Sequence, residues 1–226
     1  MSIKVILTDI EGTTTSLSFV KDILFPYARA NIADYVRNHI DDPVVKESFH
    51  QVSQILGREL DTESFIQQLI LWIDEDKKIG PLKSIQGLIW ESGYREKKYY
   101  GHIYQDAKQQ LEAWHQQGIK LYVYSSGSVY AQKLLFGFTE YGDLNNLFNG
   151  NFDTRIGGKM EPQSYQNILS KLDCKANEVL FLSDIEQELD AAKHVGMSTC
   201  WLLRESEDID PSQHQQCKNF FDVRVN

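Results

Sequence analysis

The fold of this chain is constrained most by a long helical stretch that directly follows one short strand. Residues 4–8 form an apolar run rich in β-branched side chains, which predicts a buried strand. Residues 16–100 then lack strand patterning, and their apolar residues recur at helical spacing. A plain strand–helix–strand unit has one crossover helix, so this stretch predicts an inserted helical domain. Within it we expect helices over 19–36 with a kink at Pro26, and over 43–57, 62–73 and 82–98.

After residue 100 the pattern changes to alternating helices and strands. The same criteria predict helices over 107–118, 129–138, 162–172 and 186–195, strands over 119–124, 179–182 and 199–203, and a short edge strand over 220–223. Such alternation is typical of a parallel sheet with helices on both faces. We therefore expect an α/β fold, with a doubly wound, Rossmann-like core from residues 1–15 and 101–226 and an all-helical domain from residues 16–100.

Composition and charge exclude several classes of function. The net charge of −9 argues against a nucleic-acid or membrane-surface binder, because both need a basic surface. A phosphorylated metabolite remains a possible ligand, since a metal ion and one or two cations can neutralise a local site. The three cysteines (Cys174, Cys200 and Cys217) have neither disulfide-framework nor zinc spacing, and the histidines lack metal spacing. No segment has the layout of a signal peptide or the ~18 apolar residues of a membrane span, so we expect a cytoplasmic protein.

Polar side chains that could bind a ligand or take part in catalysis lie at the carboxyl ends of the predicted strands. They are Asp9 and Glu11 after the first strand, Ser125 and Ser126 after the second, Ser183 and Asp184 after the third, and Lys159 in a glycine-flanked loop between the last two. In open α/β sheets, ligands bind just beyond these strand ends. We therefore expect these side chains to meet at one edge of the sheet.

These residue types suit phosphoryl transfer. Carboxylates from separate strands can hold Mg²⁺, which prefers oxygen ligands. An aspartate held in this way is also a competent nucleophile, and a second acid two residues further on lies on the same face of an extended segment. That acid can protonate the leaving oxygen and later activate water. A serine hydroxyl with its loop N–H groups can bind phosphate oxygens, and a lysine adds positive charge that stabilises the transition state.

The order of these motifs resembles the haloacid dehalogenase superfamily, and residues 16–100 look like the cap that this superfamily carries after its first motif. Within the superfamily, the sequence is most similar to the enolase-phosphatases of methionine salvage. The resemblance is carried by residues 9–14, 124–137, 152–159 and 180–184, with 86–90, Gly93 and Tyr94 in the predicted cap. It covers nearly the whole chain. Residues 125–137 are the most specific part, because most superfamily members show only a single Ser or Thr there.

The resemblance implies a bifunctional enzyme with one Mg²⁺ per chain. Its reaction would enolise 2,3-diketo-5-methylthiopentyl-1-phosphate and then remove the phosphate, leaving the acireductone 1,2-dihydroxy-3-keto-5-methylthiopentene. The resemblance also implies a role for each matching residue. The implied catalytic residues are Asp9 as nucleophile, Glu11 as acid and base, and Lys159; the substrate-binding residues are Ser125, Ser126 and Lys159; the metal ligands are Asp9, Glu11 through its backbone carbonyl, and Asp184.

Two glutamates, Glu11 and Glu188, distinguish this site from that of a general phosphatase or have more than one explanation. Most phosphatases of the superfamily have Asp where this chain has Glu11, but the enolase-phosphatases share the Glu, so this departure favours the narrower family. The base for the enolisation step is not assigned by the sequence, although Glu11 is a candidate. Glu188 lies one helical turn after Asp184 and is a candidate partner of it. A simpler explanation is that acids are common in the first turn of a helix, where they oppose the helix dipole.

Other interpretations stay open at this stage. The chain could be a phosphatase of the same superfamily acting on another small phosphomonoester. It could also be a signalling module phosphorylated on Asp, but such receiver domains lack a large helical insertion and do not carry the phosphorylated Asp on the first strand. Singly, each motif also suits a helix cap or a surface lysine. We expect a monomer that binds a small phosphorylated metabolite, with no nucleic-acid or membrane partner.

Overall fold

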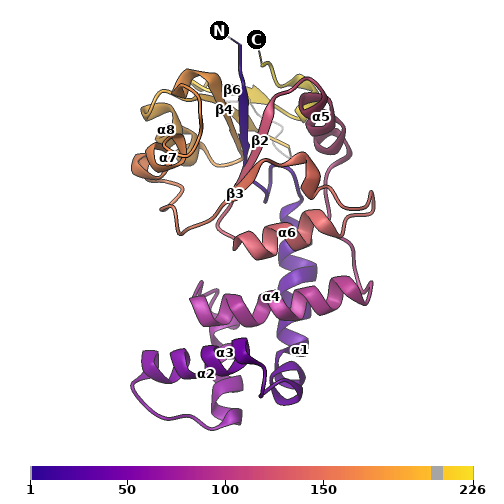
Figure 1. Cartoon of the computed structure of the whole chain (residues 1–226), viewed down its shortest axis with the longest axis vertical. Coiled ribbons are helices and arrows are strands. Elements are labelled where there is room, and N and C mark those ends of the chain that lie inside the picture. Colours follow the sequence, from indigo (N-terminus) through magenta and orange to yellow (C-terminus); the bar gives the residue numbers. More distant parts are fainter. Residues whose placement is uncertain (1, 205–210, 226) are drawn as a thin grey trace. The chain divides into compact units, whose positions relative to one another are not determined.

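A computed structural model describes residues 2–204 and 211–225, and the chain divides into two compact units (Figure 1). Unit 1 comprises residues 1–17 and 101–226, and unit 2 comprises residues 18–100. The division expected from the sequence, a core of residues 1–15 and 101–226 and a helical domain of residues 16–100, stays a prediction. That unit 2 serves as a cap for a site on unit 1 stays a prediction.

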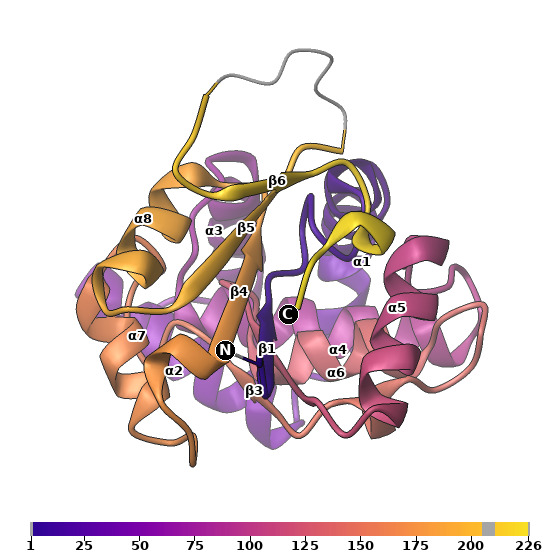
Figure 2. The same ribbon diagram turned by 90° about the horizontal axis from the view of Figure 1, so that it is seen from above.

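Unit 1 is built on a six-stranded sheet in which every neighbouring pair is parallel. The strands are β1 (Val5–Thr8), β2 (Lys120–Tyr124), β3 (Gly150–Phe152), β4 (Val179–Ser183), β5 (Ser198–Leu202) and β6 (Gln215–Cys217), in the order β3-β2-β1-β4-β5-β6. The helices of this unit are α5 (Gln105–Gln116), α6 (Val129–Gly137), α7 (Pro162–Leu169) and α8 (Glu186–His194). Helices α7 and α8 cover one face and α5 the other (Figure 2), which confirms the doubly wound fold.

Burial explains why β1 and β4 occupy the centre of this sheet. Every residue of both strands is buried. Val5 and Leu7 of β1 pack into the core formed with α7 and α8, and the alternation of side chains turns Ile6 toward the other face. Strands buried on both faces have continuous apolar sequences, as these do. Because the strands run parallel, the residues that follow β1, β2 and β4 lie at the same edge.

The end of the chain differs from the sequence-based expectation. Residues Phe220–Asp222 form a 3₁₀ turn, so the predicted edge strand over 220–223 is wrong. The Asn219 side chain accepts a hydrogen bond from the Asp222 N–H and starts this turn, and Phe220 packs against Trp114 of α5. The strand at this edge of the sheet is instead β6, which pairs with β5. Its polar sequence does not predict a strand.

Unit 2 consists of four α-helices and one π-helical turn. These are the turn Phe19–Leu24, α1 (Phe25–Asn38), α2 (Pro43–Leu56), α3 (Thr62–Asp74) and α4 (Gly80–Arg95). Pro26 lies where the π-helical turn passes into α1. Leu24 and Phe25 before it keep helical backbone angles, so the helix is continuous through this junction, and the kink at Pro26 stays a prediction. Asp42 and Asp61 cap α2 and α3 by accepting backbone N–H groups. The four helices enclose their own hydrophobic core.

The two points at which the chain leaves and re-enters unit 1 are joined by hydrogen bonds. The N–H of Ser16 donates to His102 Nδ1 over 3.0 Å, and the Thr15 hydroxyl donates to the His102 carbonyl. Two residues further on, the Tyr104 N–H donates to the Thr14 carbonyl over 2.9 Å. The two ends of the inserted unit therefore start from adjacent places on unit 1. Among the described helices, none combines the length and the hydropathy of a membrane-spanning segment.

Candidate active site

The candidate site begins with Asp9, the first residue after β1. Its N–H donates to the Leu182 carbonyl of β4 over 2.9 Å, so the backbone at this point is fixed to the neighbouring strand. Its own carbonyl accepts the hydroxyls of Thr8 and Thr14, at 2.9 and 3.3 Å. Asp9 is buried, with 5% of its surface exposed. The carboxylate is thus presented from the end of a rigid strand.

The turn after Asp9 places the first motif beside Asp184, which follows β4. Gly12 has a φ of +71°, a backbone conformation that L side chains rarely adopt. A Cβ at this position would also overlap the Asp184 carboxylate, so the turn requires glycine for two reasons. The Trp201 indole N–H donates to the Asp184 carbonyl over 2.9 Å and holds that backbone in place. The Asp184 carboxylate therefore lies directly against the loop that carries Asp9 and Glu11.

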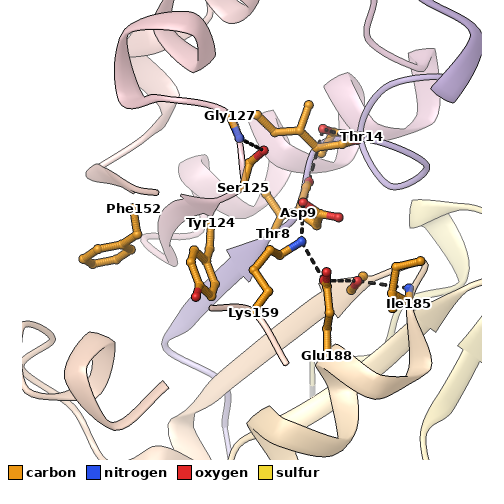
Figure 3. A network of polar contacts seen from close by, with 12 residues as sticks. Thr8, Asp9, Thr14, Tyr124, Ser125, Gly127, Phe152, Lys159, Ile185 and Glu188 are labelled. Carbon is orange, nitrogen blue, oxygen red and sulfur yellow. Dashed lines mark hydrogen bonds and ion pairs between the residues drawn. The ribbon is translucent and has the colours of Figure 1, made fainter. Parts of the chain in front are cut away.

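The ammonium group of Lys159 links the loop after β1 to helix α8 (Figure 3). Its Nζ lies 2.7 Å from Asp9 Oδ1 and 2.6 Å from Glu188 Oε2, and all three side chains are buried. Glu188 also accepts a hydrogen bond from the Ser183 hydroxyl over 2.8 Å. The Lys159 carbonyl accepts a hydrogen bond from the Tyr165 hydroxyl over 2.7 Å, which fixes the backbone of the Lys159 loop to helix α7. Lysine, nucleophile candidate and helix α8 thus form one connected network.

The charges in this network are shifted by burial and by one another. Burial alone would lower the pKa of Lys159, but the attraction of Asp9 and Glu188 outweighs it, so the pKa is raised and the ammonium stays charged. Burial raises the pKa of Glu188, and repulsion from Asp9 adds to this. Burial and then repulsion from Asp9 also raise the pKa of Asp184, to about 7. Three carboxylates therefore share one ammonium, which leaves negative charge uncompensated.

The loop after β2 contributes a different kind of group. The Ser125 N–H donates to the Phe152 carbonyl over 3.2 Å. The Gly127 N–H donates to Ser125 Oγ, also over 3.2 Å (Figure 3). Since Oγ accepts this bond, its own proton is available for donation to a bound anion. Ser128 caps α6 by accepting the Ala131 N–H, so the loop runs into a helix N-terminus.

The donor set fits a Mg²⁺ ion. Among residues 2–204 and 211–225, no three His, Cys, Asp or Glu side chains meet as a ready-made metal cage. Mg²⁺ rarely uses such a cage; it binds through one or two carboxylates, with phosphate and water completing the shell. Asp9 and Asp184 supply two carboxylates that repel each other. This repulsion adds to the effect of burial in raising the pKa of Asp184, and a divalent cation would offset it.

The structure places the predicted site residues as follows. Asp9 and Lys159 are in direct contact, Asp184 lies against Gly12, and Ser125 lies at the same sheet edge on the adjacent strand. Glu11 and Ser126 are partly exposed in the loops after β1 and β2, and the Glu11 backbone pairs with Thr15.

Sequence reasoning underrated Glu188, whose contact is with Lys159. The missed signal is its position on α8. Glu188 falls three and four residues before Ala191 and Ala192, on the buried face, where an acid without a partner is costly. The helix-dipole explanation accounts for an exposed acid in this turn but not for a buried one.

Comparison with known proteins shows which family this chain belongs to. A family model described as haloacid dehalogenase-like hydrolase matches residues 3–196. With the parallel sheet and the carboxylates at its edge, this match defines the chain as a hydrolase of that class.

Individual relatives narrow the class. Proteins named enolase-phosphatase E1 from Methylococcus capsulatus and Thioalkalivibrio sulfidiphilus are 55% and 54% identical to this chain, over 98% of it and over 98% and 99% of their own lengths. The crystal structure of the UTR4 protein from Saccharomyces cerevisiae has a TM-score of 0.83 and 36% identity, and the match covers 98% of this chain and 100% of that one. The chain belongs to the enolase-phosphatase E1 family.

Proposed function

We propose that this chain is a Mg²⁺-dependent enolase-phosphatase, or acireductone synthase, of methionine salvage. It converts 2,3-diketo-5-methylthiopentyl-1-phosphate into 1,2-dihydroxy-3-keto-5-methylthiopentene and inorganic phosphate. The observation that carries the proposal is the buried contact between Lys159 and Asp9, beside Asp184, in a chain that is more than half identical to enolase-phosphatases over nearly its whole length.

In the phosphatase step, Asp9 is the nucleophile. A carboxylate oxygen of Asp9 bonds to phosphorus as the bond from phosphorus to the substrate's ester oxygen breaks, and that oxygen takes a proton from Glu11. Glu11 then removes a proton from water, which attacks phosphorus and releases phosphate and free Asp9. Lys159 stays charged throughout and stabilises the charge of the transferring group, because its pKa is raised.

The substrate's phosphate is bound by Ser125, Ser126 and Lys159. Ser125 contributes a hydroxyl proton that the loop leaves available, and the turn that follows leads into the N-terminus of α6. Asp9, Asp184 and the Glu11 carbonyl hold one Mg²⁺, which when bound supplies positive charge that polarises a substrate carbonyl. In the enolase step, a base moves a proton from the carbon bearing the phosphate ester to the adjacent carbonyl oxygen; Glu11 is the candidate base.

The proposal is tested by measuring the two half-reactions separately. With the diketone phosphate as substrate, we expect an ultraviolet-absorbing enol intermediate before phosphate is released, and no turnover after EDTA treatment until Mg²⁺ is restored. p-Nitrophenyl phosphate serves as the comparison substrate. If phosphate is released from both substrates at similar rates with no enol, the chain is a general phosphatase and the enolase assignment is wrong.

The pKa of Asp184 predicts how metal binding responds to pH. A carboxylate must lose its proton to bind Mg²⁺, and the pKa of Asp184 is raised to about 7 by burial and by Asp9. We therefore expect Mg²⁺ affinity, measured by calorimetry, to be nearly constant above pH 8 and to fall below pH 7 with a slope that approaches about tenfold per pH unit. Asp184→Asn should weaken binding at pH 8 and remove this dependence. Equal affinity of the unchanged protein at pH 6 and 8 would contradict the role of Asp184.

We also propose that the enzyme acts as a cytoplasmic monomer on a small phosphorylated metabolite, without a nucleic-acid or membrane partner. The net charge of −9 supports this, since polyanions and anionic lipid surfaces repel such a chain. Light scattering during gel filtration measures the oligomeric state; a mass of twice 26.1 kDa would overturn the monomer.

A further inference from the structure

One buried polar side chain near the site has no part in the chemistry above. Gln132 lies on α6 and exposes only 2% of its surface. Its amide nitrogen donates to two backbone carbonyls, those of Gly127 and Phe152, both over 2.9 Å. Its amide oxygen accepts from Asn151 Nδ2 over 3.0 Å. A buried carboxamide is costly unless its hydrogen bonds are made, and here both ends of the group are used.

The two carbonyls belong to segments that are far apart in sequence. Gly127 lies in the loop after β2, and Phe152 is the last residue of β3. The Phe152 carbonyl also accepts the Ser125 N–H over 3.2 Å, so Gln132 and Ser125 share one acceptor. Gln132 therefore ties the Ser125–Ser128 loop to the end of the neighbouring strand.

This tie determines which way the loop's polar groups point. In a planar trans peptide, the carbonyl of one residue and the N–H of the next point in opposite directions. Because Gln132 holds the Gly127 carbonyl on its own side, the Ser128 N–H points away from Gln132. The Gly127 N–H meanwhile donates to Ser125 Oγ and orients that hydroxyl. Both effects depend on one orientation of the backbone around Gly127, a residue with little conformational preference of its own.

We propose that Gln132 is a positioning residue for phosphate binding, which it supports by holding the Ser125–Ser128 loop in its anion-binding conformation. This rests on the proposed function, in which Ser125 binds the substrate's phosphate. Asp153 supports the end of the same loop: its carboxylate accepts the Val129 N–H at the start of α6 over 3.1 Å. Gln132 itself touches no substrate and acts through the loop.

The test compares Gln132→Met, which keeps the side-chain length and removes every hydrogen bond, with Gln166→Met on an exposed part of α7. The probe is inorganic phosphate, whose dissociation constant in the presence of Mg²⁺ is measured directly by calorimetry. We expect Gln132→Met to weaken phosphate binding at least about tenfold and to raise KM similarly, while Mg²⁺ affinity changes less than about twofold. A lower melting temperature with unchanged phosphate affinity and unchanged KM would mean that Gln132 is merely structural, and the proposal fails.

A double variant tests whether the effect passes through the loop. If it does, Ser125→Ala combined with Gln132→Met loses little more phosphate affinity than the worse single variant, whereas independent roles give the product of the two losses. Gln132→Glu adds a rescue: when protonated, its carboxyl regains one donor, so its deficit relative to the unchanged protein should shrink from pH 8 to pH 5.5. An additive double variant, or a deficit that does not shrink, overturns the proposal.

A fallback variant covers the case in which Gln132→Met does not fold. If Gln132→Met does not fold, Asn151→Ala removes only the donor that orients the Gln132 amide, and it should weaken phosphate binding in the same direction. Unchanged binding in Asn151→Ala and Gln132→Glu would then overturn the proposal. Because phosphate binding is measured without turnover, failure of the enolase-phosphatase function appears separately, as absence of activity in the unchanged protein.

Discussion

Asp9→Asn is expected to reduce phosphate release from the diketone phosphate by at least about a thousandfold while leaving the protein folded. The substitution keeps the size of the side chain but removes the nucleophilic carboxylate. Lys159 then loses one of its two anionic partners and keeps Glu188 at 2.6 Å, so the buried ammonium remains paired. Initial rates of phosphate release, at saturating Mg²⁺, measure the effect.

The matched control is Asp173→Asn, the same chemical change at an exposed position near the amino-terminal ends of the strands. It should retain full activity. Circular dichroism and the melting temperature establish that both variants are folded. If folded Asp9→Asn turned over substrate at more than about a tenth of the normal rate, Asp9 could not be the nucleophile.

Lys159→Met is expected to damage both activity and stability. It deletes the one ammonium that contacts Asp9 and Glu188, so the buried carboxylates are left uncompensated. Removing one partner of a buried ion pair costs about 3–5 kcal/mol of unfolding free energy. Phosphate release should fall by at least about a hundredfold, since the transferring group loses its positive partner. Urea unfolding in EDTA measures stability, and Lys133→Met, at an exposed position of α6, is the control.

The pH dependence of this loss separates charge from packing. The pKa values of Glu188 and Asp184 are raised in the folded protein, and Lys159 lowers both, so they rise further without it. Carboxyl groups with raised folded-state pKa values bind protons more tightly when folded, so stability falls as pH rises through that range. The difference between Lys159→Met and the unchanged protein should therefore be larger at pH 8 than at pH 5.5. An equal difference at both values would point to lost packing.

The central part of the fold follows from local patterns in the sequence. Apolar, β-branched runs predict β1, β2 and β4, and helical spacing predicts the helices that separate them, so the parallel sheet is confirmed. The edges do not follow. Gly150 and Asn151 of β3 and the glutamines of β6 have low strand propensity, and only pairing with β2 and β5 makes them strands. Phe220 looks like a strand residue because it is apolar, but it is buried against Trp114.

The candidate site divides in a similar way. Groups at strand ends, such as Asp9 and Asp184, are predictable because the direction of a parallel strand determines the edge at which they lie. Glu188 and Gln132 are on helices, and their importance comes from contacts with Lys159 and with the loop after β2. Such contacts depend on how α6 and α8 pack on the sheet, and a helical pattern marks these positions as buried without naming their partners.

The hydrogen bonds that join Thr15 and Ser16 to His102 also bear on how a chain of this kind can be built. The two ends of the helical insertion leave unit 1 side by side. The strands of the sheet can therefore pair in the same way whether a long segment or a short turn joins these ends. Loop closure costs only about 0.6 kcal/mol more for each doubling of loop length. We therefore expect that a brief glycine linker from residue 17 to 101, or a different helical bundle in place of unit 2, would leave the strand pairings of unit 1 unchanged.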